Sequence, residues 1–591
     1  MPSSSRFHGP QRRLVLAFDI GTTFSGISYS ILDPGQIPEV KGVTKFPSQE
    51  NHSGSSKIPS VIYYDASGKV RAVGAEATAD AMYETAEEEN LIMAEWFKLH
   101  LRPKAKENED LTDQIPPLPL NKTVIDIFAD FLRYLLACAK SYIQTTHPNG
   151  SDLWNSVMGD IEFILSHPNG WEGAEQSQMR KAAVLARLIP DNTSGHTRLS
   201  FVTEGEASLH FAIRHGLPEG AIRNGEGVMI VDAGGGTIDV SSYAKQARTT
   251  EDTFPEIAVP QCYFHGSVFV SINARIFLEK MLSESPYIAD IEHIVRCFDN
   301  TTKLRFRDDR DAQFVRFASA KDNDPGCGIR FGQLKLAGSD TASFFQPSLE
   351  CIVNAVLDQR QTARKPISHV VFVGGFAAND WLYNQMNARL VPYGLTILVP
   401  NNHVNKAVSD GAVLSYLNHS VRNRIAKFSY GVKMNVHFDA NNSEHQQRVV
   451  HSFVCEVDGG RKLEGGFDVI LFKDTEVEET KEFKKPYVRC SKTRSELQGP
   501  TSVAVHCYRG ASMNPRWTDT DPNHYRRIGI LKADLSCLPP EIKVNKVTQE
   551  NYFRVDYSVI LFFGLTELKG QVAWLENGVE KRSPATIIYE P

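Results

Sequence analysis

Two short segments of the chain share a pattern of aspartate, small residues and threonine. The first is 19–23, with the sequence Asp-Ile-Gly-Thr-Thr, and the second is 232–239, with the sequence Asp-Ala-Gly-Gly-Gly-Thr-Ile-Asp. Each segment follows one apolar run and precedes another, which is typical of a turn between two β-strands. The wide separation of the two copies favours a duplicated domain over a repeat of short period.

Residues of these types can hold a polyphosphate and its metal ion. Glycine has no Cβ, so backbone N–H groups at a glycine turn can approach phosphate oxygens, and threonine hydroxyls add donors. An aspartate at a strand end can hold Mg²⁺ through water, because Mg²⁺ keeps most of its hydration shell. Two such turns facing each other could hold a phosphate chain from both sides. The alternative is a pair of ordinary hairpins, since a single glycine motif is weak evidence.

A third segment of similar character lies further along the chain. The apolar run 369–373 ends in Gly374 and Gly375, and the spacing of apolar residues predicts a helix over 379–390. Without side chains at the two glycines, the backbone could lie against a flat ligand such as a nucleoside. A plain strand–turn–helix connection is the alternative. Because the segment follows the second turn motif, we favour the nucleoside interpretation.

Together these segments resemble the phosphate and adenosine motifs of the seventy-kilodalton heat-shock chaperones, the heat shock protein 70 family of the actin-like ATPase superfamily. The Gly-Gly-Gly-Thr turn at 234–237 favours chaperones over sugar kinases, and 202–207 and 407–412 resemble the family's connecting segments. The resemblance covers roughly residues 14–420. It is greatest to the divergent branch called heat shock 70 kDa protein 12, on Pro168, Asn169, Gly170 and Trp171, on Trp96, Phe97 and Lys98, and on the Ser-Tyr-Gly-Val segment at 429–432.

The resemblance implies an α/β fold: a duplicated actin-like (ribonuclease H-like) two-lobed ATPase domain, followed by a small all-β C-terminal domain. It implies Mg²⁺ with ATP or ADP between the lobes. The implied catalytic residues are Asp19, Glu204, Asp232 and Thr237, with Asp19 and Asp232 also holding Mg²⁺ through water. The implied nucleotide-binding residues are Gly21, Thr22, Thr23, Gly234, Gly235, Gly236, Thr237, Asp239, Asp299, Lys303, Gly374 and Gly375.

Two of these assignments have ordinary alternatives. Glu204 is expected to position water near the γ-phosphate, but an acid at the start of a helix also stabilises the helix dipole. Asp299 and Lys303 are expected to flank the adenine, and a solvated helix face is the alternative for both.

The chain also departs from the family pattern. The family's catalytic lysine is expected four residues after Gly74, where this chain has Thr78. Loss of that cation predicts slow ATP hydrolysis, because a positive charge normally stabilises the transferring phosphoryl group. Lys98 could substitute, although we favour a structural role for it. Asn405 stands where the family usually has aspartate, and 418–427 is basic where the family has an acidic linker.

Hydrophobic periodicity predicts the elements that position these residues. Strands are expected within 14–32, at 161–165 and at 369–373, and helices at 123–145, 173–188, 204–215, 270–282, 379–390 and 407–417. β-rich runs are expected at 467–472, 501–509, 528–533 and 552–563, and a solvated loop or helix face at 476–485. The predicted domains are a disordered leader at 1–13, a first lobe at 14–226, a second lobe at 227–420 with an inserted subdomain at about 251–340, and a β-rich domain at 428–591 without a helical lid.

Bulk composition limits the class of protein. The 591 residues are 41% hydrophobic with a net charge of −6, which gives no reason to expect nucleic acid or an anionic membrane as partner. Nine cysteines without a Cys-x-x-Cys pair argue against a zinc site and favour a reducing compartment. No apolar run is long enough to span a bilayer. These features predict a cytoplasmic protein and leave a nuclear location open.

Three functions remain open. The favoured one is a chaperone-like protein that binds ATP, hydrolyses it slowly and binds polypeptide through its β domain. The second is a nucleotide-gated scaffold that hydrolyses little ATP and recruits a specific protein partner. A small-molecule kinase of the actin and sugar-kinase superfamily is a weaker third. The P-loop, zinc-protease and serine-hydrolase motifs do not occur in the sequence.

Overall fold

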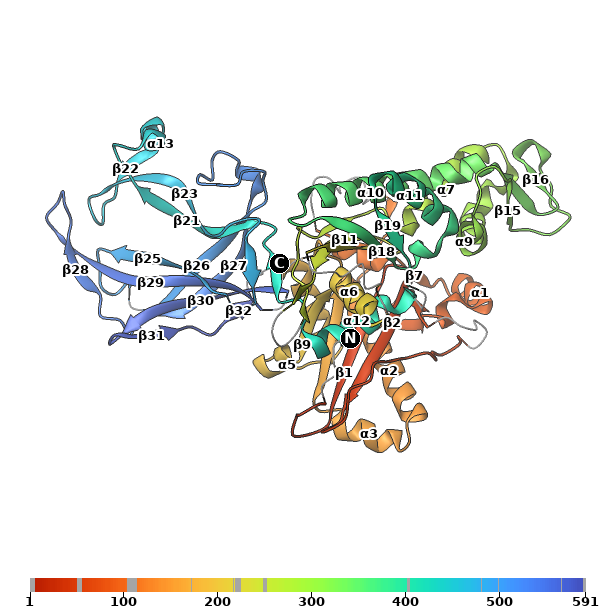
Figure 1. The fold of residues 1–591 in the computed structure, drawn as a ribbon, viewed down its shortest axis with the longest axis horizontal. Coiled ribbons are helices and arrows are strands. Elements are labelled where there is room, and N and C mark those ends of the chain that lie inside the picture. The colour runs from red at the N-terminus through yellow and green to blue at the C-terminus, as the bar shows by residue number, and fades with distance from the viewer. Residues whose placement is uncertain are drawn as a thin grey trace. The chain divides into compact units, whose positions relative to one another are not determined.

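The computed structural model describes residues 6–49, 56–103, 114–171, 173–215, 217, 225–247, 252–400, 404–479, 481–497, 499–564 and 566–587. The protein is of mixed α/β class and divides into two compact units (Figure 1). The first comprises Met1–Trp171 and Gln178–Val421, and the second comprises Glu172–Ser177 and Arg422–Pro591. Within the described part of the chain, no helix has the length and apolar character needed to cross a membrane.

The first unit contains a sheet in the order β3-β2-β1-β8-β9. Strands β1 (Arg13–Ile20) and β2 (Phe24–Leu32) form an antiparallel hairpin, so residues 21–23 are its turn, as the sequence predicted. On the other side of β1, β8 (Ile161–His167) and then β9 (Leu199–Thr203) are added in parallel. Strands buried on both faces read as continuous apolar runs, which is why β1 and β8 were visible in the sequence.

A second sheet of the same unit repeats this arrangement. Its order is β14-β11-β10-β18-β19, with β10 (Gly227–Ala233) and β11 (Ile238–Ala244) as the antiparallel hairpin. Strands β18 (Ile367–Val373) and β19 (Thr396–Leu398) are then added in parallel beside β10. Both sheets therefore carry a turn at the same topological position, and in the second sheet that turn is 234–237.

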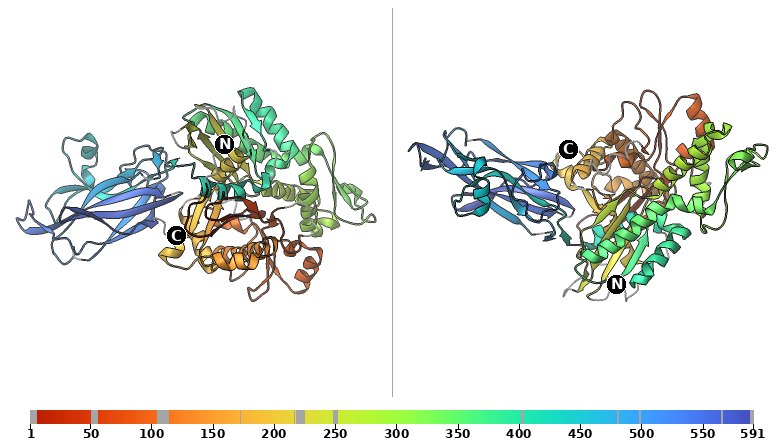
Figure 2. Two further views of the ribbon diagram at one scale, coloured as in Figure 1. Left: turned by 60° about the horizontal axis from the view of Figure 1, so that its bottom comes forward. Right: turned by 90° about the horizontal axis from the view of Figure 1, so that it is seen from above.

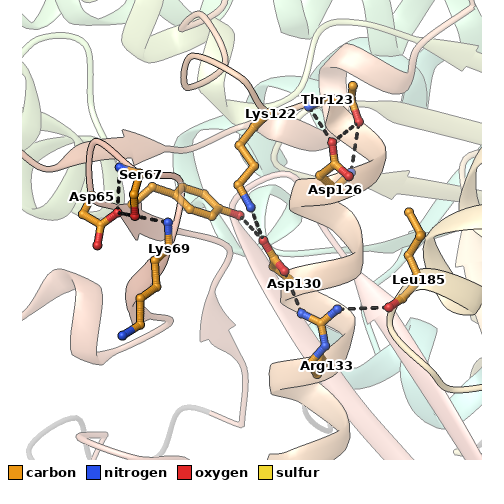
Figure 3. Close-up of polar contacts among 10 residues, drawn as sticks. Asp65, Ser67, Lys69, Lys122, Thr123, Asp126, Asp130, Arg133 and Leu185 are labelled. Atoms are coloured by element: carbon orange, nitrogen blue, oxygen red, sulfur yellow. Dashed lines mark hydrogen bonds and ion pairs between the residues drawn. The ribbon is translucent and has the colours of Figure 1, made fainter.

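Helix α2 (Val124–Thr146) confirms the helix predicted over 123–145. Its start is fixed by a capping box: Thr123 Oγ1 accepts a hydrogen bond from Asp126 N at 3.2 Å, and Asp126 Oδ2 accepts one from Thr123 N at 2.9 Å (Figure 3). One turn later, Asp130 accepts a hydrogen bond from Arg133 Nη1 at 2.7 Å. The opposite face of α2 is buried in the core of the first unit.

The other helices predicted from periodicity are also present, with ends shifted by a few residues. They are α4 (Gly173–Leu185), α6 (Glu204–Arg214), α7 (Ser267–Met281), α11 (Asp380–Leu390) and α12 (Ala407–Asn418). Gly216, expected to end α6, lies outside the described residues. Helices α6 and α12 pack closely, because a Cβ on Gly411 would lie 1.8 Å from the Ala207 carbonyl oxygen. The other α-helices among the described residues of the first unit are α1 (Asp80–Glu88), α3 (Gly150–Val157), α5 (Thr193–Thr197), α8 (Ile291–Cys297), α9 (Lys303–Arg305) and α10 (Gly338–Thr362).

The second unit consists mainly of strands, and Figure 2 shows them from two further directions. One sheet has the order β22-β23-β21-β26-β27 and another the order β25-β29-β30-β31, and buried residues of both form one hydrophobic core. The strands are β21 (Ser429–His437), β22 (Ser452–Val454), β23 (Arg461–Leu471), β25 (Phe483–Ser491), β26 (Pro500–Tyr508), β27 (Tyr525–Asp534), β29 (Asn551–Gly564), β30 (Glu567–Glu576) and β31 (Val579–Arg582). A short helix, α13 (Ser443–Gln447), interrupts the strands.

The structure of the charged run at 476–485 differs from the prediction. It was expected to be a solvated loop or helix face, but it contains strand β24 (Glu476–Glu478) and the start of β25. Val477 is buried between two exposed glutamates, so the run alternates with the period of a strand. The high charge obscured this alternation in the sequence.

Candidate functional site

The two turns of the first unit lie against each other. A Cβ added to Gly235 would lie 2.4 Å from Thr23 Oγ1, and one added to Gly236 would lie 2.3 Å from Thr22 Oγ1. Only glycine fits against the two threonines without displacing them. At this contact the first turn supplies hydroxyl groups, and Gly235 and Gly236 of the second turn supply backbone without side chains.

A cavity of about 250 Å³ lies at this junction. It is lined by Asp19, Gly21, Thr22, Thr23, Phe24, Lys57, Lys98, Glu204, Asp232, Gly234, Gly235, Thr237, Gly374, Gly375, Asn405 and Val408. Most of the predicted site residues are among them, although they come from segments far apart in the sequence. Of the other predicted residues, Gly236 packs on Thr22 beside the cavity, and Asp239 is buried opposite Asp232 across the β10–β11 hairpin.

Gly374 shows why the third segment needs glycine. Its φ is 95°, a left-handed conformation that side chains rarely adopt, and a Cβ there would lie 2.4 Å from Asp232 Oδ1. The backbone after β18 therefore passes beside the carboxylate of Asp232 because residue 374 has no side chain. This close approach joins the diglycine segment to the second turn.

Glu204 is placed by the start of α6. It is the first residue of the helix, and the N-cap Thr203 accepts a hydrogen bond from Glu206 N at 3.1 Å. An acid in the first turn of a helix stabilises the helix, so the ordinary role for Glu204 holds. Because the Glu204 side chain also lines the cavity, the functional role stays open beside it.

Four carboxylates, Asp19, Glu204, Asp232 and Asp239, are buried at or beside the cavity. Two of them have a lysine partner. Lys57 Nζ lies 2.7 Å from Asp19 Oδ2, and Lys98 Nζ lies 2.5 Å from Glu204 Oε1. Among the described residues, no lysine or arginine forms an ion pair with Asp232 or Asp239.

Asp232 is contacted by a hydroxyl group and forms no ion pair with a described residue. Ser208 Oγ donates a hydrogen bond to Asp232 Oδ2 at 3.1 Å. Burial raises the pKa of Asp232 to about 8, and the neighbouring carboxylates of Glu204 and Asp239 add to the increase. A proton or a metal ion is therefore needed to balance its charge at neutral pH.

Asp239 has the same excess of negative charge. Burial raises its pKa, and Glu204 raises it further, while a hydrogen bond from Asn169 N to Asp239 Oδ1, 2.6 Å long, opposes the increase. The second oxygen, Oδ2, is buried and has no hydrogen-bond partner among the described residues.

The Lys98–Glu204 pair is almost entirely buried, with 3% of Lys98 and 8% of Glu204 exposed. Burial disfavours the Lys98 ammonium, but the carboxylates of Glu204, Asp19 and Asp239 outweigh burial and raise the pKa of Lys98. Burial also raises the pKa of Glu204, with Lys98 opposing the increase. Lys98 therefore keeps its proton and brings a positive charge to the cavity.

Slow hydrolysis was expected because Thr78 replaces the family's lysine, but two other lysines line the cavity. Thr78 does not line the cavity; its Oγ1 donates a hydrogen bond to Ala75 O at 3.2 Å within a short helical turn. Lys98, for which we favoured a structural role, lines the cavity, and so does Lys57, which the sequence did not indicate. Lys57 belongs to no motif, and the Trp-Phe-Lys segment that contains Lys98 gave no spacing that would place it beside Glu204.

Asp299 and Lys303 do not line the cavity. They form an ion pair with each other one helical turn apart, and Lys303 Nζ donates a hydrogen bond to Ser271 Oγ at 3.1 Å. The alternative of a solvated helix face is wrong for Lys303, which is only 6% exposed. Their side chains satisfy each other beside α7.

The residues fit a hydrated divalent cation better than a directly bound one. Among the residues that the structure describes, no three His, Cys, Asp or Glu side chains are placed to ligate one metal ion. Asp19 and Asp232 nevertheless both line the cavity, and the acids around it outnumber the two lysines. Carboxylates that reach a cation through water satisfy both observations.

The sequence matches no protein-family model and no curated protein. The functional interpretation therefore depends on the chemistry of the cavity: two turns in contact, an excess of buried carboxylates, and two lysines.

Proposed function

We propose that the first unit binds Mg²⁺ and ATP in this cavity and hydrolyses ATP to ADP and phosphate. The observation that carries the proposal is the contact between the threonine turn and the glycine turn at a cavity that three carboxylates and two lysines also line. The repeated strand order of the two sheets supports a duplicated actin-like, ribonuclease H-like fold. On this proposal, the first sheet belongs to one lobe and the second sheet to the other.

The excess negative charge of the buried carboxylates favours a metal ion in the cavity. Asp19 and Asp232 would hold Mg²⁺ through water, and the ion would offset the carboxylates that the lysines leave unbalanced. When bound, Mg²⁺ neutralises charge on the phosphate oxygens. Metal and nucleotide binding should therefore be strongly coupled.

Backbone and side-chain groups of the cavity would bind the nucleotide and promote its hydrolysis. Backbone N–H groups of 235–237 and the hydroxyls of Thr22 and Thr23 would bind phosphate oxygens. Gly374 and Gly375 would lie against the nucleoside. Glu204 would orient the attacking water by accepting a hydrogen bond from it, and Lys98 would stabilise negative charge on the phosphoryl group.

Slow turnover remains our expectation, for a different reason from the one that the sequence suggested. Lys98 and Glu204 are paired with each other at 2.5 Å. Both proposed roles require this ion pair to open, so Lys98 can reach phosphate and Glu204 can reach water. Opening a buried ion pair is costly, because each charge is left without its partner.

Isothermal titration of ATP in the presence of Mg²⁺ tests the site. Gly235→Val adds side-chain atoms where Thr23 already lies, so we expect ATP affinity to fall at least about tenfold. Gly159→Val is the matched control, because an added Cβ there meets nothing within 4 Å. Equal ATP affinity in the two variants would remove the facing turns from the binding site.

We propose further that the second unit binds extended polypeptide weakly, which would make the protein chaperone-like. The supporting observation is a groove of about 760 Å³ along β25, β29 and β30, lined by aromatic, apolar and charged residues that include Tyr487, Tyr557, Trp574 and Leu575. Apolar side chains of a peptide could lie on the rings while the backbone contacts the polar groups.

Fluorescence anisotropy with a labelled apolar heptapeptide tests this part. Leu575→Asp places a charge in the groove at a residue that is 67% exposed, so we expect weaker peptide binding without unfolding. Val450→Asp is the control, since Val450 is 80% exposed and does not line the groove. No binding by the unaltered protein would instead favour the nucleotide-gated scaffold.

A further inference from the structure

The Trp171 ring lies beside Lys98, one of the two lysines that line the cavity. It lies at the end of the loop that follows β8, and its ring centroid is 5.6 Å from Lys98 Nζ. Both side chains are buried, with 2% of Trp171 and 3% of Lys98 exposed. An ammonium group over an aromatic ring is attracted by the negative face of the ring, and more strongly when water is excluded.

The loop that carries Trp171 is fixed by hydrogen bonds. Trp171 N donates to Pro168 O at 3.0 Å, which closes a tight turn. Within this turn, Asn169 N donates to Asp239 Oδ1 at 2.6 Å, and Asn169 Oδ1 accepts a hydrogen bond from Gly205 N at 3.3 Å. The loop that carries the indole is therefore hydrogen-bonded to strand β11 and to the start of α6, the two elements that place Asp239 and Glu204.

Hydrogen bonding does not explain why this position holds tryptophan. The indole Nε1 is buried, and no acceptor for it exists among the described residues. A buried N–H group without a partner is unfavourable, so the benefit of the side chain must lie in its ring. The contact that the ring offers to the site is the one with Lys98.

We propose that Trp171 is the positioning residue for Lys98. A lysine side chain has four rotatable bonds, and freedom of that kind would spread its ammonium over many positions. The ring restricts Lys98 to the wall of the cavity, so its ammonium can exchange Glu204 for a phosphate oxygen without leaving the site. The phosphate ligand of this inference depends on the proposed function, whereas the contact between Trp171 and Lys98 depends only on the structure.

The rate of ATP hydrolysis tests the positioning role. In Trp171→Leu we expect kcat to fall about tenfold with KM for ATP changed less than about twofold, because the lysine is displaced but the turns are intact. Trp171→Phe keeps an aromatic face and should recover most of the rate. Trp154→Leu is the matched control, since Trp154 is equally buried in the core of the same unit and its loss should leave kcat unchanged. Equal kcat in the two leucine variants would overturn the proposal, and so would a Phe variant as slow as Leu.

A double-mutant cycle separates this inference from the proposed function. If Trp171 acts through Lys98, adding Trp171→Leu to Lys98→Met should lower kcat no further. The unaltered protein, the two single variants and the double variant also allow a measurement without nucleotide. The fall in unfolding temperature of the double variant should be smaller than the sum of the falls in the two single variants. Additive shifts would overturn the contact even if ATP were hydrolysed. Less-than-additive shifts in a protein that does not bind ATP would overturn the proposed function and support the contact.

Discussion

The two turns at the cavity have the same topology and different chemistry. The first turn offers the hydroxyls of Thr22 and Thr23, whereas the second offers glycines that make room for them. The aspartates that precede the turns differ as well. Asp19 has Lys57 at 2.7 Å, while Asp232 receives a hydrogen bond from Ser208 and forms no ion pair with any described residue. The two sheets therefore share their strand arrangement, while the charged partners of their aspartates differ.

This asymmetry has a functional consequence. The part of the chain before β10 provides both lysines and two of the three threonines that line the cavity, so it is suited to binding anionic oxygens. The side of the second turn keeps uncompensated carboxylates, so it is suited to a hydrated cation. A metal–phosphate complex would match both sides at once, and four experiments test that division.

The largest effect is expected from Lys98→Met. Removing the positive charge from the phosphate side should lower kcat for ATP about 10²–10³-fold, the usual result of losing one preorganised electrostatic contact. Single-turnover hydrolysis measures this, with Lys122→Met as a control lysine that pairs with Asp130 away from the cavity. An unchanged rate in Lys98→Met would contradict the assignment of phosphate binding to this part of the cavity, because hydrolysis would then not require Lys98.

A smaller effect is expected from Thr23→Val, which removes one hydroxyl and preserves the shape of the side chain. ATP affinity should fall about tenfold, the typical value of one hydrogen bond to a charged group. Thr145→Val on the exposed face of α2 removes a hydroxyl that bonds only within its own helix, so its ATP affinity should stay unchanged. Titration calorimetry would show equal affinities if the first turn does not donate to phosphate.

The dependence of stability on pH tests the carboxylate side without nucleotide. The pKa of Asp232 is raised from 3.8 to about 8, so between these values the folded protein binds the proton more tightly than the unfolded chain does. Stability should therefore fall as pH rises from about 4 to about 8 in the absence of Mg²⁺. Asp232→Asn should flatten this fall in unfolding temperature.

Asp19→Asn is the matched comparison for Asp232→Asn. It removes the carboxylate charge that Lys57 contacts, so we expect it to lower the unfolding temperature at pH 8, where Asp232→Asn should raise it. Shifts of the same sign in the two variants would show that the two aspartates are equivalent. The asymmetry between the turns would then have no energetic basis.

The smallest effect is expected from Thr78→Lys. Because Thr78 does not line the cavity, an added ammonium at this position should change kcat less than about twofold. A large increase in turnover would mean that position 78 reaches the bound nucleotide, as the spacing after Gly74 suggested. It would also mean that Lys98 is not the cation of the site.

Local patterns in the sequence were sufficient for the elements that carry the site. Both hairpins, the strand before Gly374 and helices such as α2 could be predicted, because apolar periodicity, turn glycines and capping residues act over a few positions along the chain. The aspartates and glycines of the cavity followed from the same motifs. Even in the charged run at 476–485, exposed and buried residues alternate at neighbouring positions, although the high charge made this pattern hard to recognise in the sequence.

Only the tertiary structure decided which charges meet. No local pattern predicts the partners of Lys57 and Lys98, yet folding brings these lysines to Asp19 and Glu204. It also brings the Trp171 ring to Lys98. It also leaves Asp299 and Lys303 paired with each other beside α7. The physical reason is the range of the forces: a turn or a helix is fixed by neighbours in sequence, whereas an ion pair depends on distance and burial, which exist only after distant segments have packed.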